Sequence, residues 1–119
     1  MSCDGSIIEH SGVIGWISNG SGAIDAVSNL GFDCWEEKDN SRCLRVVLVE
    51  DGSKPFDALL SDAAVALKRL ADSGMLVDNI SIGVVKQAGL ATCSLSGSGK
   101  NWAEISRLVG QIEIVVYGD

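Results

Sequence analysis

The amino-acid sequence predicts an α+β fold, with helices packed on one face of a mainly antiparallel sheet. Two features predict this class. At three places a helix-like stretch meets a strand-like run at a glycine, namely Gly31, Gly74 and Gly110. Glycine just past a helix adopts the left-handed conformation that other residues resist, so each glycine predicts a helix end. In addition, apolar residues recur at helical spacing over 55–73, which is typical of a helix that lies on a sheet.

The first predicted strand covers residues 7–17, where Gly12 and Gly15 mark a bend or a close approach of another backbone segment. A short helix over 22–30 follows, and Ser21 stands at its predicted N-cap. Helical spacing places three apolar side chains of this helix on one face: Ile24, Val27 and Leu30.

Two strands come next and form a predicted hairpin. They cover 32–36 and 42–50, and the polar residues between them favour a turn centred on Lys38 and Asp39. The second strand contains the most strand-like run of the chain, because it is rich in valine and leucine.

The clearest helix is predicted over 55–73, with Pro55 as its first helical residue. Proline suits this position because the first helical N–H groups have no partner within the helix. Acidic residues come early in this helix and basic residues late, which suits the helix dipole. Its predicted buried face is Phe56, Leu59, Leu60, Ala63, Ala64, Leu67, Leu70 and Ala71.

The last third of the chain predicts a strand over 77–86, a possible short strand over 92–95, a helix over 100–109 and a final strand over 111–117. In the first of these strands Ile80, Ile82 and Val84 share one face. The predicted inward face of the helix is Trp102, Ile105, Leu108 and Val109.

The first six elements follow the order β-α-β-β-α-β, which is the ferredoxin-like plan. An additional C-terminal α-β unit then adds a strand at a sheet edge or begins a second layer. At 119 residues the chain is predicted to form a single α+β domain over 1–119.

Charge and hydropathy limit the kinds of partner. The net charge of −7 argues against nucleic acid and anionic membranes, because both are bound through positive charge. The chain has no run of 18 apolar residues, and its first residues lack the basic and apolar regions of a secretory signal. The expected compartment is therefore the cytoplasm.

The four cysteines, at positions 3, 34, 43 and 93, include no C-x-x-C pair, and His10 is the only histidine. A zinc site is therefore not predicted. A hairpin centred on Lys38 and Asp39 would place Cys34 and Cys43 opposite each other. Two buried thiols on one face are favoured for a cytosolic protein, and a cross-strand disulfide is the alternative.

No cofactor motif or catalytic motif is complete. The loop over 96–101 contains Gly-Lys, but it lacks the earlier glycine and the following Ser or Thr of a phosphate-binding loop, so it predicts a helix cap. Gly12, Gly15, Gly20 and Gly22 do not fit a dinucleotide fingerprint. An anion at the helix start near Ser21 and Gly22 is a weaker alternative. No serine stands in G-x-S-x-G, so His10 is interpreted as a strand residue.

Acidic side chains crowd the predicted hairpin around one tryptophan. Carboxylates steer and select a basic protein surface, and the aromatic ring supplies area to bury. A solvated hairpin tip with the indole packed beneath it is the structural alternative, and a glycosidase-like carboxylate pair lacks the aromatic row that binds a sugar. The predicted partner-binding residues are Asp33, Trp35, Glu36, Glu37, Asp39, Glu50 and Asp51.

The small size, the acidic charge, this hairpin and the closing segment from Trp102 to Tyr117 resemble bacterial immunity proteins that neutralise polymorphic toxins, including those of contact-dependent growth inhibition. This resemblance implies a cytoplasmic protein without enzymatic activity that binds one cognate toxin domain. The toxin is expected to be basic, often a nuclease, and to be blocked by steric and electrostatic occlusion.

Two other functions stay open. Ferredoxin-like domains commonly pair and bind small metabolites at the interface, so the chain is alternatively a ligand-binding regulatory module and a homodimer. The glycines at 12, 15, 20 and 22 would then let the ligand approach the backbone. A third hypothesis is an enzyme that uses His10 with a carboxylate.

Overall fold

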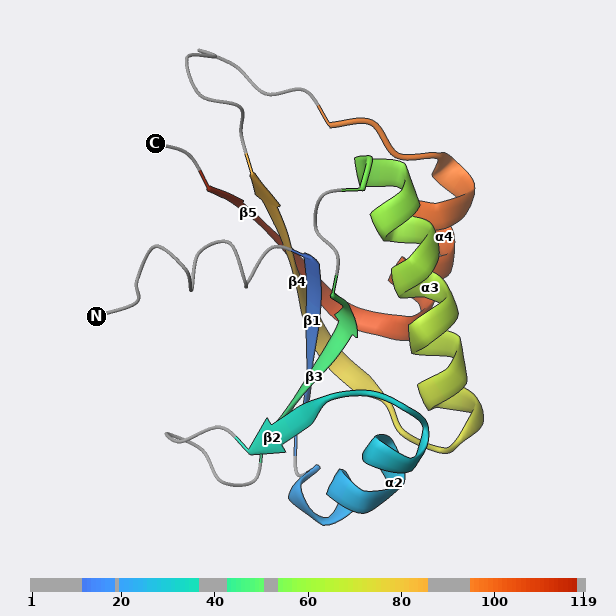
Figure 1. The fold of residues 1–119 in the computed structure, drawn as a ribbon. Helices are drawn as coiled ribbons and strands as arrows, with labels where there is room; N and C mark the ends of the chain where they lie inside the picture. The colour runs from blue at the N-terminus through green and yellow to red at the C-terminus, as the bar shows by residue number, and fades with distance from the viewer. Residues whose placement is uncertain (1–11, 19, 37–42, 51–53, 86–94, 118–119) are drawn as a thin grey trace, which may run out of the picture.

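The computed structural model describes residues 12–18, 20–36, 43–50, 54–85 and 95–117. These residues form an α+β fold with one five-stranded mixed sheet, three α-helices and a 3-10 turn, η1 (Figure 1). The elements in chain order are β1 (Gly12–Ile17), η1 (Ser21–Ala23), α2 (Ile24–Asn29), β2 (Cys34–Glu36), β3 (Leu44–Val49), α3 (Phe56–Asp72), β4 (Val77–Val85), α4 (Gly99–Leu108) and β5 (Val109–Tyr117).

The strands lie in the order β2-β3-β1-β4-β5. The pairs β2–β3, β3–β1 and β1–β4 are antiparallel, and only β5 runs parallel to its neighbour β4. The C-terminal α-β unit therefore extends the sheet at one edge, with α4 as the connection between two parallel strands. It does not begin a second layer.

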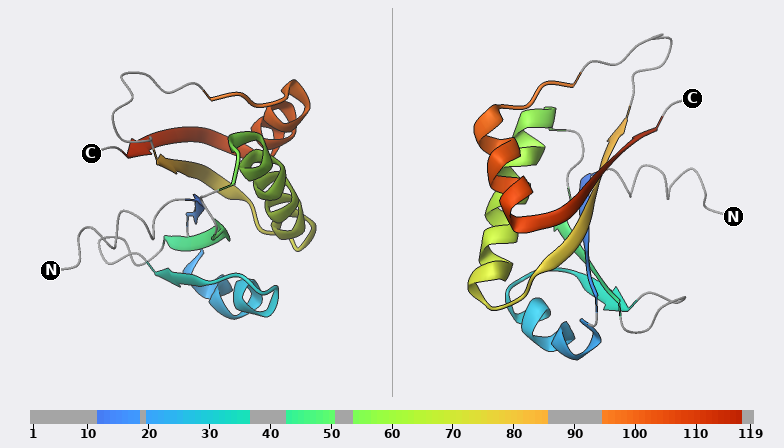
Figure 2. Two further views of the ribbon diagram at one scale, coloured as in Figure 1. Left: turned by 45° about the horizontal axis from the view of Figure 1, so that its top comes forward. Right: turned by 180° about the vertical axis from the view of Figure 1, so that it is seen from behind.

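The hydrophobic core lies between the sheet and α3. The helix runs along the sheet beside α4, as both views of Figure 2 show. Helical periodicity predicted the buried face of α3, and every large residue of that face is buried. Opposite it, Leu44 and Val46 on β3 and Ile80 and Ile82 on β4 are fully buried. The ring of Phe56 contacts that of Trp102, with centroids 5.8 Å apart, and joins α3 to α4.

Two of the three predicted glycine junctions are confirmed. Gly31 and Gly74 have φ values of 97° and 84°, so each ends a helix in the left-handed region. The prediction for Gly110 is wrong, because α4 ends at Leu108 and β5 begins at Val109. Gly110 lies inside the strand, where a Cβ atom would be 3.0 Å from the carbonyl oxygen of Asp78.

The first strand is described from Gly12 onward, so the predicted part over 7–11, including His10, lies outside the described residues. Gly12 has a φ of 121°, and a Cβ atom there would lie 2.3 Å from the carbonyl oxygen of Val49. The pairing of β1 with β3 also shifts register between Val13 and Ile14. The predicted close approach of backbone at this glycine is therefore confirmed.

Three element boundaries differ from prediction. The helix over 22–30 is divided into η1 and a six-residue α2, and Ser21 lies inside η1 instead of capping it. Pro55 is the N-cap of α3, with an extended ψ of 149°, and Phe56 is the first helical residue. The possible strand over 92–95 falls outside the described residues except for Leu95, which is not in a strand.

The predicted register of the hairpin is wrong. Cys34 pairs with Val46 across β2 and β3, three residues beyond Cys43. That offset is about 10 Å along the strand, beyond the Cα separation that a disulfide spans. Cys34 and Cys43 are not joined by a disulfide, and both are half-buried. Cys43 precedes the buried Leu44, so strand alternation places it on the opposite face from Cys34.

Candidate functional site

The edge strand β2 brings together three of the seven predicted partner-binding residues. Trp35 lies in the middle of this strand and is 42% exposed, a high value for a tryptophan. Asp33 precedes the strand and Glu36 ends it, and both side chains are exposed. The edge of the sheet therefore presents an aromatic residue between two solvated carboxylates.

The other four predicted residues do not join this group in the described structure. Glu50 is exposed, but it follows β3 five residues after Arg45, the residue that pairs with Trp35. Five strand residues correspond to roughly 17 Å, so Glu50 lies at the far end of the strand, as its place in the sequence predicts. Glu37, Asp39 and Asp51 lie outside the described residues.

A row of side chains across the sheet holds the indole of Trp35 in place. Arg45 pairs with both Trp35 on β2 and Trp16 on β1. Its guanidinium carbon lies 5.4 Å from the centroid of the Trp35 ring and 5.7 Å from that of Trp16. A guanidinium over an aromatic face is attracted by the ring quadrupole. These contacts orient Trp35 on its strand, so little freedom is lost when a partner covers it.

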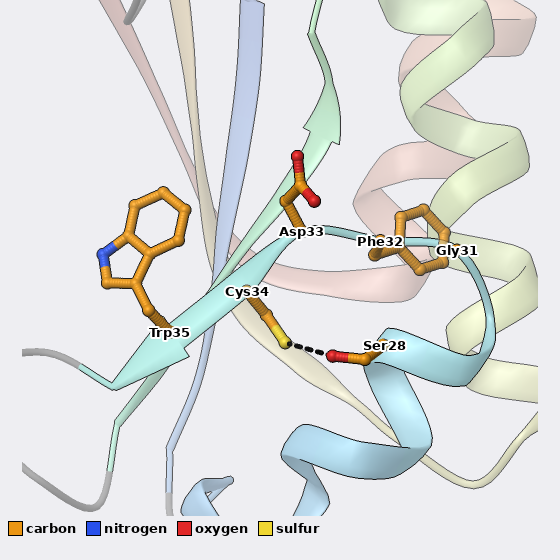
Figure 3. Close-up of a pocket in the computed structure, with 6 residues that line it drawn as sticks. All are labelled: Ser28, Gly31, Phe32, Asp33, Cys34 and Trp35. Carbon is orange, nitrogen blue, oxygen red and sulfur yellow. Dashed lines mark hydrogen bonds between the residues drawn. The ribbon is translucent and has the colours of Figure 1, made fainter.

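A hollow of about 480 Å³ lies beside β2, between the strand and α2 (Figure 3). Cys34 and Trp35 point to opposite sides of the strand, and the cysteine sulfur faces α2. This sulfur lies 3.5 Å from Oγ of Ser28 and donates to the carbonyl oxygen of Ile24 at 3.7 Å. The residues that line the hollow are Ser28, Gly31, Phe32, Asp33, Cys34 and Trp35.

A side chain near the C-terminal end of α3 holds the wall of the hollow in place. Arg69 donates a hydrogen bond to the carbonyl oxygen of Leu30, the C-cap residue of α2. Its guanidinium carbon also lies 4.9 Å from the centroid of the Phe32 ring, which is buried. A cation at a helix C-terminus interacts favourably with the helix dipole. Arg69 therefore ties the turn that leads into β2 to the main helix of the fold.

The loop over 96–101 has a structural role, as the sequence predicts. Oγ of Ser98 accepts a hydrogen bond from the backbone N–H of Asn101, so it caps α4. The carboxylate of Asp57 on α3 accepts from the backbone N–H of Ser98 at 2.7 Å and from the side chain of Asn101 at 3.0 Å. These hydrogen bonds, led by that from Ser98, lower the pKa of Asp57.

The described part of the chain lacks a metal-binding cluster and a membrane-spanning helix. No group of three or more His, Cys, Asp or Glu side chains there is arranged to hold a metal ion. No helix among these residues is long and apolar enough to cross a membrane.

Sequence reasoning found Trp35 and its acidic neighbours but missed Arg45, Trp16 and Arg69. The only signal for Arg45 was its place as the single charged residue in a strongly apolar strand. Its two indole partners depend on the register of three strands, which the sequence does not state. Arg69 is one of the late basic residues of α3 that the sequence relates only to the dipole of that helix, whereas its side chain reaches the end of α2.

Comparison with known proteins adds no assignment. No family model matches this chain, and neither the curated proteins nor the solved structures include a match.

Proposed function

We propose that this chain is an inhibitory binding protein that docks a basic protein domain on the β2 edge. The observation that carries the proposal is Trp35, an exposed and oriented aromatic residue between the carboxylates of Asp33 and Glu36. Buried aromatic anchors dominate the energy of protein interfaces, and flanking charge selects the partner and speeds encounter. The net charge of −7 favours a basic partner in the same way.

The partner that fits this proposal is a toxin domain, and the chain would act as its immunity protein in the cytoplasm. The resemblance in size, charge and C-terminal segment supports this class. Binding at the β2 edge would block the toxin by covering its basic surface, such as the substrate-binding surface of a nuclease. No catalytic group of this chain is required.

We also infer that the first four strands and the helices α2 and α3 have the ferredoxin-like arrangement, with the helices on one face. The strand order β2-β3-β1-β4, with every neighbouring pair antiparallel, supports this inference. The fully buried residues of β3 and β4 lie on the side of α3, which also supports it. The strand β5 is then an addition to that core.

The alternative, a small-ligand module, gains no support from three of the four glycines that suggested it. A Cβ atom at Gly12 would meet the backbone of Val49, and one at Gly15 would lie 2.9 Å from the side chain of Val77. At Gly20 it would meet Ile17 at 2.8 Å. These three glycines make room for other parts of this chain and leave no space for a ligand, whereas a Cβ atom at Gly22 would meet nothing within 4 Å.

Capture experiments with matched charge variants test the proposed function. The tagged wild-type protein and two double variants are each exposed to lysate of the source organism at low and moderate salt. Asp33→Lys with Glu36→Lys reverses the β2 charges, and Glu50→Lys with Asp72→Lys makes the same change in net charge elsewhere. All four carboxylates are exposed, so both variants should remain folded.

The wild type and the Glu50/Asp72 variant should retain the same basic protein in stoichiometric amount, and the Asp33/Glu36 variant should not. The retained protein is then purified, and its toxicity on expression should be relieved by coexpression of the wild type. Equal retention by the two variants would remove the β2 edge from the proposal. A retained protein that is harmless on its own would contradict the immunity function.

A further inference from the structure

We infer that the partner docks by adding an extended basic segment to the free edge of β2, as one more strand of the sheet. This inference rests on the proposed function and specifies its binding mode. It concerns the backbone N–H and C=O groups of β2, whose contribution is separate from that of the Trp35 ring and of the acidic side chains. Strand addition of this kind obtains affinity from backbone hydrogen bonds and specificity from alternate side chains.

The register shows which backbone groups of β2 face outward. The N–H of Val47 donates to the carbonyl oxygen of Asp33 at 2.9 Å, so this opposed pair is a hydrogen-bonded one. Hydrogen-bonded and non-hydrogen-bonded pairs alternate in an antiparallel ladder. Trp35 therefore bonds to Arg45 on β3, whereas the N–H and C=O groups of Cys34 and Glu36 point away from the sheet.

These outward groups are available in the described part of the chain. β2 is the last strand of the sheet, and its one strand neighbour is β3. No backbone hydrogen bond between described residues uses the outward groups of Cys34 or Glu36. The hollow of about 480 Å³ opens beside the same residues. Over the extent of this hollow, an added strand would not collide with α2.

Strand alternation decides what the added segment must carry. Asp33 and Trp35 present their side chains on one face of β2, and Cys34 and Glu36 on the other. A side chain opposite Trp35 would meet an indole face next to a carboxylate, an environment that favours lysine or arginine. On the other face, the position opposite Cys34 adjoins the hollow and favours an apolar side chain, and the next position meets Glu36.

The negative charge of the β2 edge also excludes most other segments as the added strand. An exposed strand edge is prone to indiscriminate pairing, and charged residues on the edge discourage it. Asp33 and Glu36 would repel an acidic or a second identical β2 edge placed opposite them. The occupant that fits is therefore an extended basic segment of the partner, with a basic residue opposite Trp35 and an apolar residue opposite Cys34.

A proline substitution separates the main-chain contribution from the charge. Glu36→Pro removes the outward N–H and the carboxylate, and Glu36→Thr removes the carboxylate alone. Proline is tolerated on an edge strand where its nitrogen faces solvent, so Glu36→Pro should keep the β2–β3 ladder. The probe is a seven-residue peptide of alternating lysine and valine, with an N-methylated version that cannot pair as a strand.

We expect Glu36→Pro to bind this peptide about fivefold more weakly than Glu36→Thr, because it lacks one interstrand hydrogen bond. The N-methylated peptide should lose the same factor or more on the wild type. Independently of any variant, the peptide should slow hydrogen exchange of the Cys34 and Glu36 amides in the wild type. The amide of Trp35, which already bonds to β3, should change little.

Equal affinity of Glu36→Pro and Glu36→Thr, with no added protection of the two amides, would overturn strand addition. Absence of any binding of the lysine–valine peptide to the wild type at millimolar concentration would overturn it as well. Neither result touches the proposed function, which is decided by the charge-reversal capture. Loss of capture by the Asp33/Glu36 variant together with a negative peptide result would mean that the partner docks through side chains alone.

Discussion

The two edge strands of the sheet, β2 and β5, differ in length, in charge and in what holds them. β2 has three residues, and Trp35 at its centre stands between Asp33, which precedes the strand, and Glu36, which ends it. β5 has nine residues, of which only Glu113 is charged. It pairs Ile114 with Ile82 and Val116 with Val84, so it continues the apolar side of the sheet beyond the core.

This comparison teaches that exposure by itself does not identify a binding site. Trp35 and Val116 are exposed to a similar degree, 42% and 47%. Val116 extends a row of core residues, whereas Trp35 belongs to a row with Arg45 and Trp16 on the other face. The β2 edge therefore combines an oriented aromatic ring with charge, and charge is what selects one partner among many.

The largest expected effect concerns how β5 is held. Ile105 on α4 is completely buried, and α4 connects β4 to β5. Ile105→Ala should lower the free energy of unfolding by about 3 kcal/mol, because it removes buried methyl groups and leaves a cavity. Chemical denaturation measures this loss, and hydrogen exchange of the β5 amides should accelerate with it.

Val65→Ala is the control for that substitution, because the Val65 side chain on α3 is 60% exposed. Its free energy of unfolding should stay within about 0.5 kcal/mol of the wild type. A loss of less than about 1 kcal/mol in Ile105→Ala would mean that β5 does not depend on the packing of α4.

The second prediction compares the two edges directly. Trp35→Ala should weaken binding of the captured partner by about 2 kcal/mol, which is roughly 30-fold, because it removes the aromatic anchor. Val116→Ala removes a side chain of similar fractional exposure from the other edge and should leave affinity within about twofold. Isothermal titration calorimetry with the purified partner distinguishes them. If Val116→Ala is the more damaging variant, the partner docks on β5 and the comparison is reversed.

Local patterns predicted the elements that depend on one segment. The apolar face of α3 follows from helical periodicity, and the helix lies on the sheet as expected, with its contacts to β3 and β4. The glycine signals worked at Gly31 and Gly74, where a single residue must reverse the chain. At Gly110 the same signal failed, because a helix also passes directly into a strand without a left-handed residue.

The site could be predicted only in part, because it depends on register. Counting residues around a supposed turn centre placed Cys34 opposite Cys43, whereas the strands pair Cys34 with Val46. A shift of this kind changes every cross-strand neighbour. The acidic residues beside Trp35 are adjacent in sequence and were found. Arg45 and Trp16 come from two other strands, so their place beside the indole could not be predicted without the strand register.

The third prediction concerns the turn that leads into β2. Gly31 has a φ of 97°, and a Cβ atom there would meet nothing within 4 Å. Gly31→Ala should therefore cost about 1 kcal/mol of stability through backbone strain alone. Gly22→Ala, where a Cβ atom also meets nothing and φ is not positive, should change stability by less than about 0.5 kcal/mol. Thermal and chemical denaturation of the pair would contradict this account if both variants behaved alike.

The smallest expected effect is a pH dependence at the opposite end of the fold from β2. The backbone N–H of Ser98, and next the side chain of Asn101, lower the pKa of Asp57 below its ordinary value of 3.8. The unfolded chain lacks these donors, so it binds a proton at higher pH than the folded chain does. The stabilising contribution is therefore complete above the ordinary pKa and is lost as the pH falls through the folded value.

Asp57→Asn should flatten this acid-side loss, because an amide does not ionise while its oxygen still accepts from Ser98. The free energy of unfolding, measured in steps from about pH 6 to about pH 3, gives the slope for each protein. Ser98→Ala is the matched control, since it keeps the backbone donor but removes the α4 cap, and should lose about 1 kcal/mol at every pH. Parallel curves for the wild type and Asp57→Asn would show that the α3–α4 junction does not depend on the charge of Asp57. The acid sensitivity of the fold would then have another origin than this junction.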